Sequence, residues 1–308
     1  MSAFRTTTSE AKVQAVAENP EFHAWINLVK NVSILDHKVS MRDGHEITVR
    51  SYTPGRPAAD GSPLIVNYHG GGFCVGDLDT DDLMCKRFSH RLRAVVLNVD
   101  YRLAPEYPFP AGIHDAWDSL KWKAAVNATT LLKANPSKGF VVKGTSAGAN
   151  FSAVLAHLAR DEELSPPLTG GFLSIPATVH HAAVPEIYKA DYQSYDQNKN
   201  VPFLNRELMD VFMSCYKPIP TDPLYSALLW TNGHANLVPQ VFQICGADPL
   251  CDEGLIYERE LRKAGVKTKL FFYPGLPHGA IDFFPQVPAC RKGDREIFEG
   301  MKWLLEQE

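Results

Sequence analysis

The sequence predicts an α/β protein with a mostly parallel sheet that is covered by helices on both faces. Two observations lead to this prediction. Short apolar runs alternate with helical segments along most of the chain, as in a sheet built from strand–helix units. Most of these runs are apolar without interruption, which is expected of strands whose two faces are both buried. The length of 308 residues does not by itself decide between one large domain and two.

The predicted strands are short runs that are rich in β-branched and aromatic residues. In chain order they cover residues 47–52, 64–68, 94–99, 140–142, 171–175, 241–245 and 269–273. The predicted helices between them cover residues 115–125, 149–160 and 253–264. We expect Gly265 to close the last of these helices as its C-terminal cap, because glycine adopts the left-handed conformation that such caps require.

The overall composition excludes several classes of function. A net charge of −4 and a pI of about 6.3 leave no basic patch for a phosphate backbone, so nucleic acid is not an expected partner. The polar first ten residues lack the apolar core of a secretory signal, and no apolar stretch approaches the ~18 residues of a membrane span. The six cysteines are scattered and form no C-x-x-C pair. We therefore expect a cytoplasmic protein with reduced cysteines and no stable membrane insertion.

A G-x-S-x-G motif is the most informative feature of the chain. Ser146 stands at its centre, between Gly144 and Gly148, directly after the predicted strand 140–142. This motif presents a serine hydroxyl on a sharp strand-to-helix turn, and its glycines allow the close backbone approach of that turn. The motif alone is common by chance, but it is accompanied here by three further motifs that follow predicted strands.

Two downstream residues complete a nucleophile, an acid and a base in the order Ser146, Asp248 and His278. The carboxyl ends of neighbouring parallel strands meet at one edge of a sheet, so these residues can gather there. Asp252 and Glu253 are local rivals for the acid, but Asp248 follows its strand more closely. We expect Asp252 to cap the helix that follows.

The sequence His69-Gly70-Gly71-Gly72 follows another predicted strand and suits an oxyanion hole. We expect the backbone N–H groups of Gly71, Gly72 and Ala147 to stabilise the oxyanion of the reaction. His69 is expected to brace the glycine loop, and Asp100 is expected to form a structural ion pair with Arg102.

These motifs, with the segment 100–111 (DYRLAPEYPFPA), resemble the hormone-sensitive lipase family of carboxylesterases from about residue 40 to the end of the chain. The segment 144–150 (GTSAGAN) is most similar to fungal members, some of which act in secondary-metabolite pathways. The resemblance implies an α/β-hydrolase fold, with a mostly parallel eight-stranded sheet, flanking helices, a helical cap, and a triad of Ser146, Asp248 and His278.

Two segments break the alternation of strands and helices and are candidates for the cap. Residues 1–30 have the apolar spacing of an amphipathic helix, and residues 177–230 are first irregular and then helical around 204–216. We expect a single domain over residues 1–308, in which these segments cover a core of about 31–176 and 231–308. The alternative is that they pack as ordinary outer helices.

The resulting hypothesis is a serine carboxylesterase that acts on a small-molecule ester without a metal or organic cofactor. We expect short- to medium-chain esters, because no long apolar lid helix suits a lipid interface. Activity should fall on acidification, since a protonated His278 cannot take the serine proton. Five residues are candidate walls of the substrate pocket, although those at helical spacing suit a cap core equally well: Phe73, Phe203, Met209, Phe212 and Met213.

Two other functions use the same fold. The first alternative is an acyltransferase, thioesterase or lactone-forming enzyme, in which the acyl-enzyme reacts with something other than water. The second is a non-catalytic small-molecule receptor, which the presence of His278 disfavours. The sequence does not determine the natural substrate or the oligomeric state, and it does not exclude a homodimer.

Overall fold

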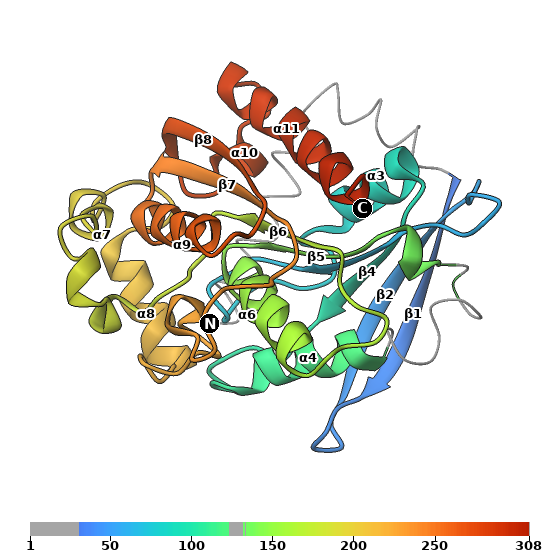
Figure 1. Cartoon of the computed structure of the whole chain (residues 1–308), viewed down its shortest axis with the longest axis horizontal. Coiled ribbons are helices and arrows are strands. Elements are labelled where there is room, and N and C mark those ends of the chain that lie inside the picture. Colours follow the sequence, from blue (N-terminus) through green and yellow to red (C-terminus); the bar gives the residue numbers. More distant parts are fainter. Residues whose placement is uncertain (1–30, 123–131, 133, 308) are drawn as a thin grey trace.

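A computed structural model describes residues 31–122, 132 and 134–307, which form an eight-stranded sheet with helices on both faces (Figure 1). The strand order is β1-β2-β4-β3-β5-β6-β7-β8. Strand β2 pairs antiparallel with β1 and β4, and all later pairs are parallel. The predicted mostly parallel sheet of eight strands is therefore confirmed.

Seven of the strands coincide with predicted runs and the eighth, β1, was not predicted. Most side chains of β1 are exposed and β1 pairs only with β2, so its sequence carries no apolar alternation. The strands are β1 (Val32–Ser40), β2 (Glu46–Pro54), β3 (Leu64–Tyr68), β4 (Val95–Asp100), β5 (Phe140–Thr145), β6 (Gly170–Ser174), β7 (Gln240–Ala247) and β8 (Thr268–Pro277).

Two hydrophobic clusters, one on each face of the sheet, explain the uninterrupted apolar runs. Along β3, Leu64 and Val66 belong to one cluster and Ile65 belongs to the other. Helices α4 (Ala111–Trp122), α6 (Ala147–Asp161) and α9 (Cys251–Lys263) contribute to the first cluster. Helices α3 (Asp82–Leu92) and α11 (Pro288–Leu305) cover the opposite face (Figure 1).

Helices α4, α6 and α9 were predicted within a few residues of their ends, whereas α3 and α11 were not. Gly265 has a φ of +84° and its N–H donates to Arg262, so the predicted cap of α9 is confirmed. Two glycines weaken the helical signal of α11. One of them, Gly300, packs so closely on the sheet that a Cβ there would press against Val241 and Phe172.

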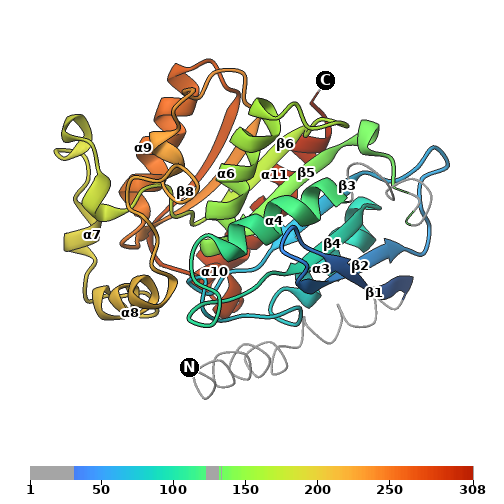
Figure 2. The same ribbon diagram turned by 90° about the horizontal axis from the view of Figure 1, so that it is seen from below.

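The segment 177–230 contains α7 (Ser194–Gln197), α8 (Arg206–Tyr216) and several 3₁₀ turns. Figures 1 and 2 show α7 and α8 at the end of the molecule opposite β1. Helix α8 begins where the Asn205 side chain accepts the N–H of Leu208 at 2.9 Å. The other predicted cap segment, residues 1–30, lies outside the described residues.

None of the helices within the described ranges is both long and apolar enough to cross a membrane.

Candidate active site

Ser146 occupies a strained turn between β5 and α6. Its φ of 54° and ψ of −115° lie outside the regions that most residues adopt. A Cβ at Gly144 would collide with the backbone of Gly148, and one at Gly148 would collide with the backbone of Tyr68. The two glycines of the motif are therefore required by close packing at the turn, which holds the serine hydroxyl at the carboxyl edge of the sheet.

Strand register brings the other two residues of the predicted triad together. Ala247 on β7 pairs with Pro277 on β8, so Asp248 and His278 leave their strands side by side. His278 Nδ1 lies 2.7 Å from Asp248 Oδ2, and His278 Nε2 lies 2.9 Å from Ser146 Oγ. With the proton on Nδ1 donated to the buried carboxylate, Nε2 is left to accept the serine proton.

The glycine loop after β3 supplies backbone donors beside the serine. Gly71 and Gly72 have φ values of +129° and +59°, which glycine adopts without strain. Within the described part of the chain, the N–H groups of Gly71, Gly72 and Ala147 make no hydrogen bond. A Cβ at Gly72 would also overlap the ring of Phe212. The three donors predicted for an oxyanion hole therefore gather near Ser146.

His69 braces this loop, as predicted. Its Nδ1–H donates to the carbonyl of Gly70 at 2.8 Å, and the Tyr101 hydroxyl donates to the carbonyl of His69 at 2.8 Å. The two rings stack with centroids 4.3 Å apart. Burial lowers the pKa of His69, which favours the neutral ring.

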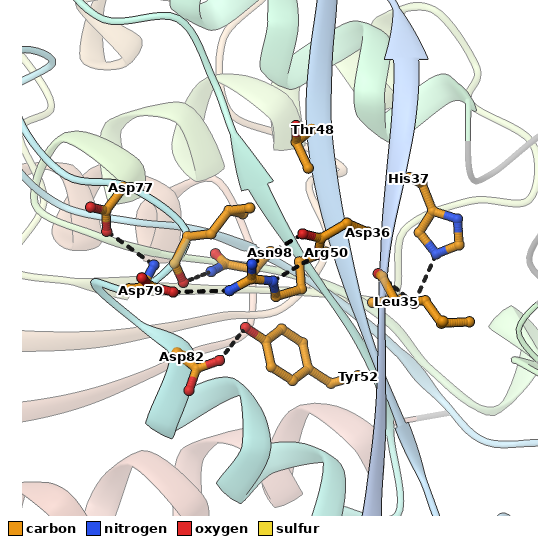
Figure 3. A network of polar contacts seen from close by, with 12 residues as sticks. Leu35, Asp36, His37, Thr48, Arg50, Tyr52, Asp77, Asp79, Asp82 and Asn98 are labelled. Carbon is orange, nitrogen blue, oxygen red and sulfur yellow. Dashed lines mark hydrogen bonds and ion pairs between the residues drawn. The ribbon is translucent and has the colours of Figure 1, made fainter.

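A polar network fastens the chain that follows the glycine loop (Figure 3). Asp77 accepts the N–H groups of Asp79 and Thr80, each at 3.0 Å. Arg50 on β2 binds Asp79 at 2.9 Å and Asp36 on β1 at 2.7 Å. The antiparallel edge of the sheet thereby anchors a loop that begins at the candidate oxyanion donors.

The predicted ion pair between Asp100 and Arg102 is wrong. The Arg102 guanidinium binds both oxygens of Asp115, at 2.9 and 2.7 Å, and Asp43 at 2.6 Å. Alternate residues of an extended chain point in similar directions, but a carboxylate on α4 offers the bidentate geometry that arginine prefers. Arg102 thus joins the β4–α4 loop to α4 and does not reach the serine.

A cavity of about 780 Å³ opens above Ser146 and His278. All five residues predicted for the pocket line it. Phe73 and Phe212 are buried and also belong to the core, Met209 and Met213 are partly buried against that core, and Phe203 is 43% exposed. The α8 side chains therefore have both of the roles that the sequence left open. The same face of α8 packs on the core and forms a wall of the cavity.

Other residues that line the cavity were not predicted from the sequence. Leu208 lies one turn before Phe212 on α8, so helical spacing could have found it. Phe283 lies five residues after His278, on the short helix α10 (Ala280–Phe283). Tyr225 lines the cavity and its hydroxyl lies 3.3 Å from the sulfur of Met213. No local pattern marks the last two, because only the tertiary fold brings them to the serine.

The two rivals of Asp248 hold the segment 177–230 against α9. Asp252 Oδ2 accepts the N–H groups of Gln193 and Ser194, at 2.7 and 2.6 Å, at the start of α7. The prediction that Asp252 caps its own helix is therefore wrong, because its side chain turns back to satisfy another helix start. Glu253 is buried, accepts the N–H of Thr178 at 2.7 Å and lies 3.2 Å from the Tyr192 hydroxyl.

Glu253 is expected to make the folded protein less stable as the pH rises. Burial raises the pKa of Glu253 from 4.5 to about 8. Between these two values the folded state keeps a proton that the unfolded chain releases. The contribution of Glu253 to the free energy of unfolding is therefore complete below pH 4.5 and is lost as the pH rises through about 8. In Glu253→Gln, which has the shape of the protonated acid, urea unfolding from pH 5 to 9 should show a flatter loss of stability. Equal slopes in both proteins would contradict this assignment.

All six cysteines are free, and five of them are buried. In the part of the chain that the structure describes, no three His, Cys, Asp or Glu side chains are grouped as metal ligands would be.

Comparison with known proteins places this geometry in a family. Residues 65–282 match the family described as alpha/beta hydrolase fold. An AB hydrolase superfamily protein of Schizosaccharomyces pombe is 40% identical over 278 residues, which cover 90% of this chain and 81% of that protein. The versiconal hemiacetal acetate esterase of Dothistroma septosporum is 38% identical over 246 residues, which cover 80% of this chain and 74% of that protein.

A solved structure agrees with these matches. The crystal structure of vibralactone cyclase superposes with a TM-score of 0.85 at 37% sequence identity, and the match covers 89% of this chain and 80% of that chain. The chain therefore belongs to the α/β-hydrolase fold family, and its resemblance to the carboxylesterases related to hormone-sensitive lipase is confirmed.

Proposed function

We propose that the protein is a serine carboxylesterase that hydrolyses short- to medium-chain esters through an acyl-enzyme on Ser146. One observation carries this proposal, namely the continuous hydrogen-bonded chain from Asp248 through His278 to the Ser146 hydroxyl at the floor of the cavity. The membership of the α/β-hydrolase family and the similarity to an enzyme named as an esterase support it.

In the acylation step, His278 Nε2 takes the Ser146 proton as the oxygen attacks the ester carbonyl. Asp248 holds the imidazole in the tautomer that can accept this proton and stabilises the imidazolium. The negative oxygen of the tetrahedral intermediate accepts hydrogen bonds from the N–H groups of Gly71, Gly72 and Ala147. His278 then protonates the leaving alcohol as the carbon–oxygen bond breaks.

In the deacylation step, His278 removes a proton from water as the water oxygen attacks the acyl carbon. His278 then returns this proton to Ser146 Oγ as the carbon–oxygen bond breaks and the acid is released. The same donors stabilise the second tetrahedral intermediate. No step requires a metal or an organic cofactor. We propose that the segment 177–230 acts as a cap that closes the cavity, since α8 supplies Met209, Phe212 and Met213 to its wall. A largely apolar enclosure suits an apolar acyl group.

The preference for acyl chains is expected to rise gently and then fall. Each methylene group that the cavity accommodates adds about 0.8 kcal/mol of transfer free energy. Once the chain exceeds the cavity, steric clash should lower kcat/KM steeply. Measurement of kcat/KM for p-nitrophenyl esters from acetate to palmitate tests this expectation.

A pair of variants on α8 sharpens the same measurement. Met209→Trp narrows the cavity and should move the optimum to shorter chains. Val211→Trp is the matched control, because Val211 lies on the same helix, is 43% exposed and does not line the cavity. A maximum at palmitate, with activation at an oil–water interface, would instead identify a true lipase.

Acyl transfer or lactone formation is the second candidate, and the similarity to vibralactone cyclase favours it. Both reactions use the same acyl-enzyme and differ in the group that attacks it. Analysis of products in the presence of added alcohols, or with a hydroxy-ester substrate, separates the two. Hydrolysis predicts the free acid as the main product, and transfer predicts a new ester or a lactone. A role in a secondary-metabolite pathway is part of the carboxylesterase proposal, and the similarity to the versiconal hemiacetal acetate esterase supports it.

A further inference from the structure

Phe203 combines features that a purely structural residue rarely shows. Its φ of +72° lies in the left-handed region, which is unfavourable for a bulky side chain. Burial does not offset this strain fully, because the side chain is 43% exposed. The ring lines the cavity above Ser146. Strain in an exposed aromatic residue at a cavity wall indicates that the position of the ring itself matters.

Two aromatic rings beside the histidine hold Phe203 in place. The rings of Phe203 and Phe283 are nearly parallel, with centroids 5.5 Å apart and an interplanar angle of 8°. The ring of Phe284 meets Phe203 edge-on at 5.4 Å. This offset-stacked distance leaves no room for another ring between Phe203 and Phe283. The two stacked rings therefore form one aromatic wall of the cavity rather than a slot.

The wall lies next to His278. Phe283 ends the four-residue helix α10, which starts two residues after His278. The intervening Gly279 has a φ of +74°, and a Cβ there would lie 3.3 Å from the Phe283 ring. A second wall lies beside the glycine loop, because Phe212 on α8 lines the cavity and packs over Gly72. The cavity thus has one aromatic wall beside the histidine and another wall beside the oxyanion donors.

The chemistry of ester cleavage assigns a role to the wall beside the histidine. His278 Nε2 must protonate the leaving oxygen, so the alcohol portion of the ester has to lie on the histidine side of Ser146. Aromatic rings at that place can pack against an unsaturated ring of the alcohol by stacking or by edge-to-face contact, and a saturated ring of the same size lacks these aromatic interactions.

We propose that Phe203 and Phe283 form a leaving-group subsite that selects esters whose alcohol carries an aromatic or similarly flat unsaturated ring. This inference rests on the proposed esterase function. It names the alcohol half of the substrate, whereas the α8 side chains concern the acyl half.

Benzyl acetate and cyclohexylmethyl acetate provide the test, because they share the acetyl group and the number of carbon atoms. Both esters give the same acetyl-enzyme, so deacylation is identical. The intrinsic reactivities of the two esters differ, but this difference is the same for every variant, so the change in the ratio of their kcat/KM values from wild type to variant reports the leaving-group subsite. We expect the wild type to favour benzyl acetate. Phe203→Leu and Phe283→Leu should each lower this ratio about 3- to 10-fold, which is the range of an aromatic stacking interaction. Phe203→Tyr keeps an aromatic ring at this position, so its ratio should equal that of the wild type.

Phe272→Leu is the matched control, because Phe272 is 42% exposed and does not line the cavity. Its ratio should equal that of the wild type. An unchanged ratio in Phe203→Leu, whether both activities persist or both fall equally, would overturn the subsite and leave the ring pair as a gate or a packing element. Hydrolysis of p-nitrophenyl acetate separates the two proposals. A wild-type enzyme that hydrolyses it without preferring benzyl acetate contradicts the subsite alone, whereas a folded protein inactive on every ester contradicts the esterase function.

Discussion

Replacement of Ser146 by alanine is expected to lower kcat by about 10⁴-fold or more, in line with the removal of a nucleophile from other serine hydrolases. The variant should also lose covalent labelling by organophosphonates, because no hydroxyl remains next to His278 Nε2. The fold should persist, since the backbone N–H of Ser146 still donates to Ser174 at 2.8 Å. Hydrolysis of p-nitrophenyl butyrate and mass spectrometry of the labelled protein measure the two effects.

Ser174→Ala is the matched control for this experiment. Ser174 ends the neighbouring strand β6, and its hydroxyl lies 3.3 Å from the Gln243 side chain. Its removal should leave labelling intact. If Ser146→Ala were still labelled at full stoichiometry, the nucleophile would have to be another residue, and the esterase mechanism proposed above would fail.

The parallel strands were predictable because burial on both faces leaves a strong local signal. Each strand from β3 to β7 has a buried, largely apolar centre, so its position could be found from the sequence with errors at the ends only. Strand β1 lacked this signal, since its exposed side chains show no alternation. In α11 the apolar spacing is present, but Gly293 and Gly300 interrupt it for reasons of packing.

The site shows the same division between local and tertiary information. Ser146, Asp248 and His278 each follow a strand directly, and a strand end is a position that the sequence marks. The partners of Arg102 and Asp252 lie 13 and 58 or more residues away, so sequence proximity suggested the wrong contacts. Phe283 could not be placed beside Phe203 for the same reason, because the two rings meet only when α10 returns toward the segment before α8.

Replacement of Asp248 by asparagine is expected to lower kcat by roughly 10⁴-fold, the magnitude known for the same change in a serine protease triad. The reason is the direction of the new amide. Leu250 N–H donates to Asp248 Oδ1 at 2.9 Å, so the oxygen of the asparagine amide will occupy this position and turn the NH₂ group toward His278. An NH₂ group facing Nδ1 favours the imidazole with its proton on Nε2, which cannot accept the serine proton.

Asp252→Asn is the matched comparison, because it makes the same chemical change four residues away at a carboxylate that receives N–H groups of Gln193 and Ser194. The remaining amide oxygen can keep part of this contact. We expect stability to fall by roughly 1–2 kcal/mol, the scale of a lost charge-assisted hydrogen bond or helix cap, and kcat to change by only a few-fold. Urea unfolding and p-nitrophenyl butyrate turnover, measured on both folded variants, give the ranking. The reverse order in kcat would assign the acid of the triad to Asp252, which the 2.7 Å contact between Asp248 and His278 makes unfavourable.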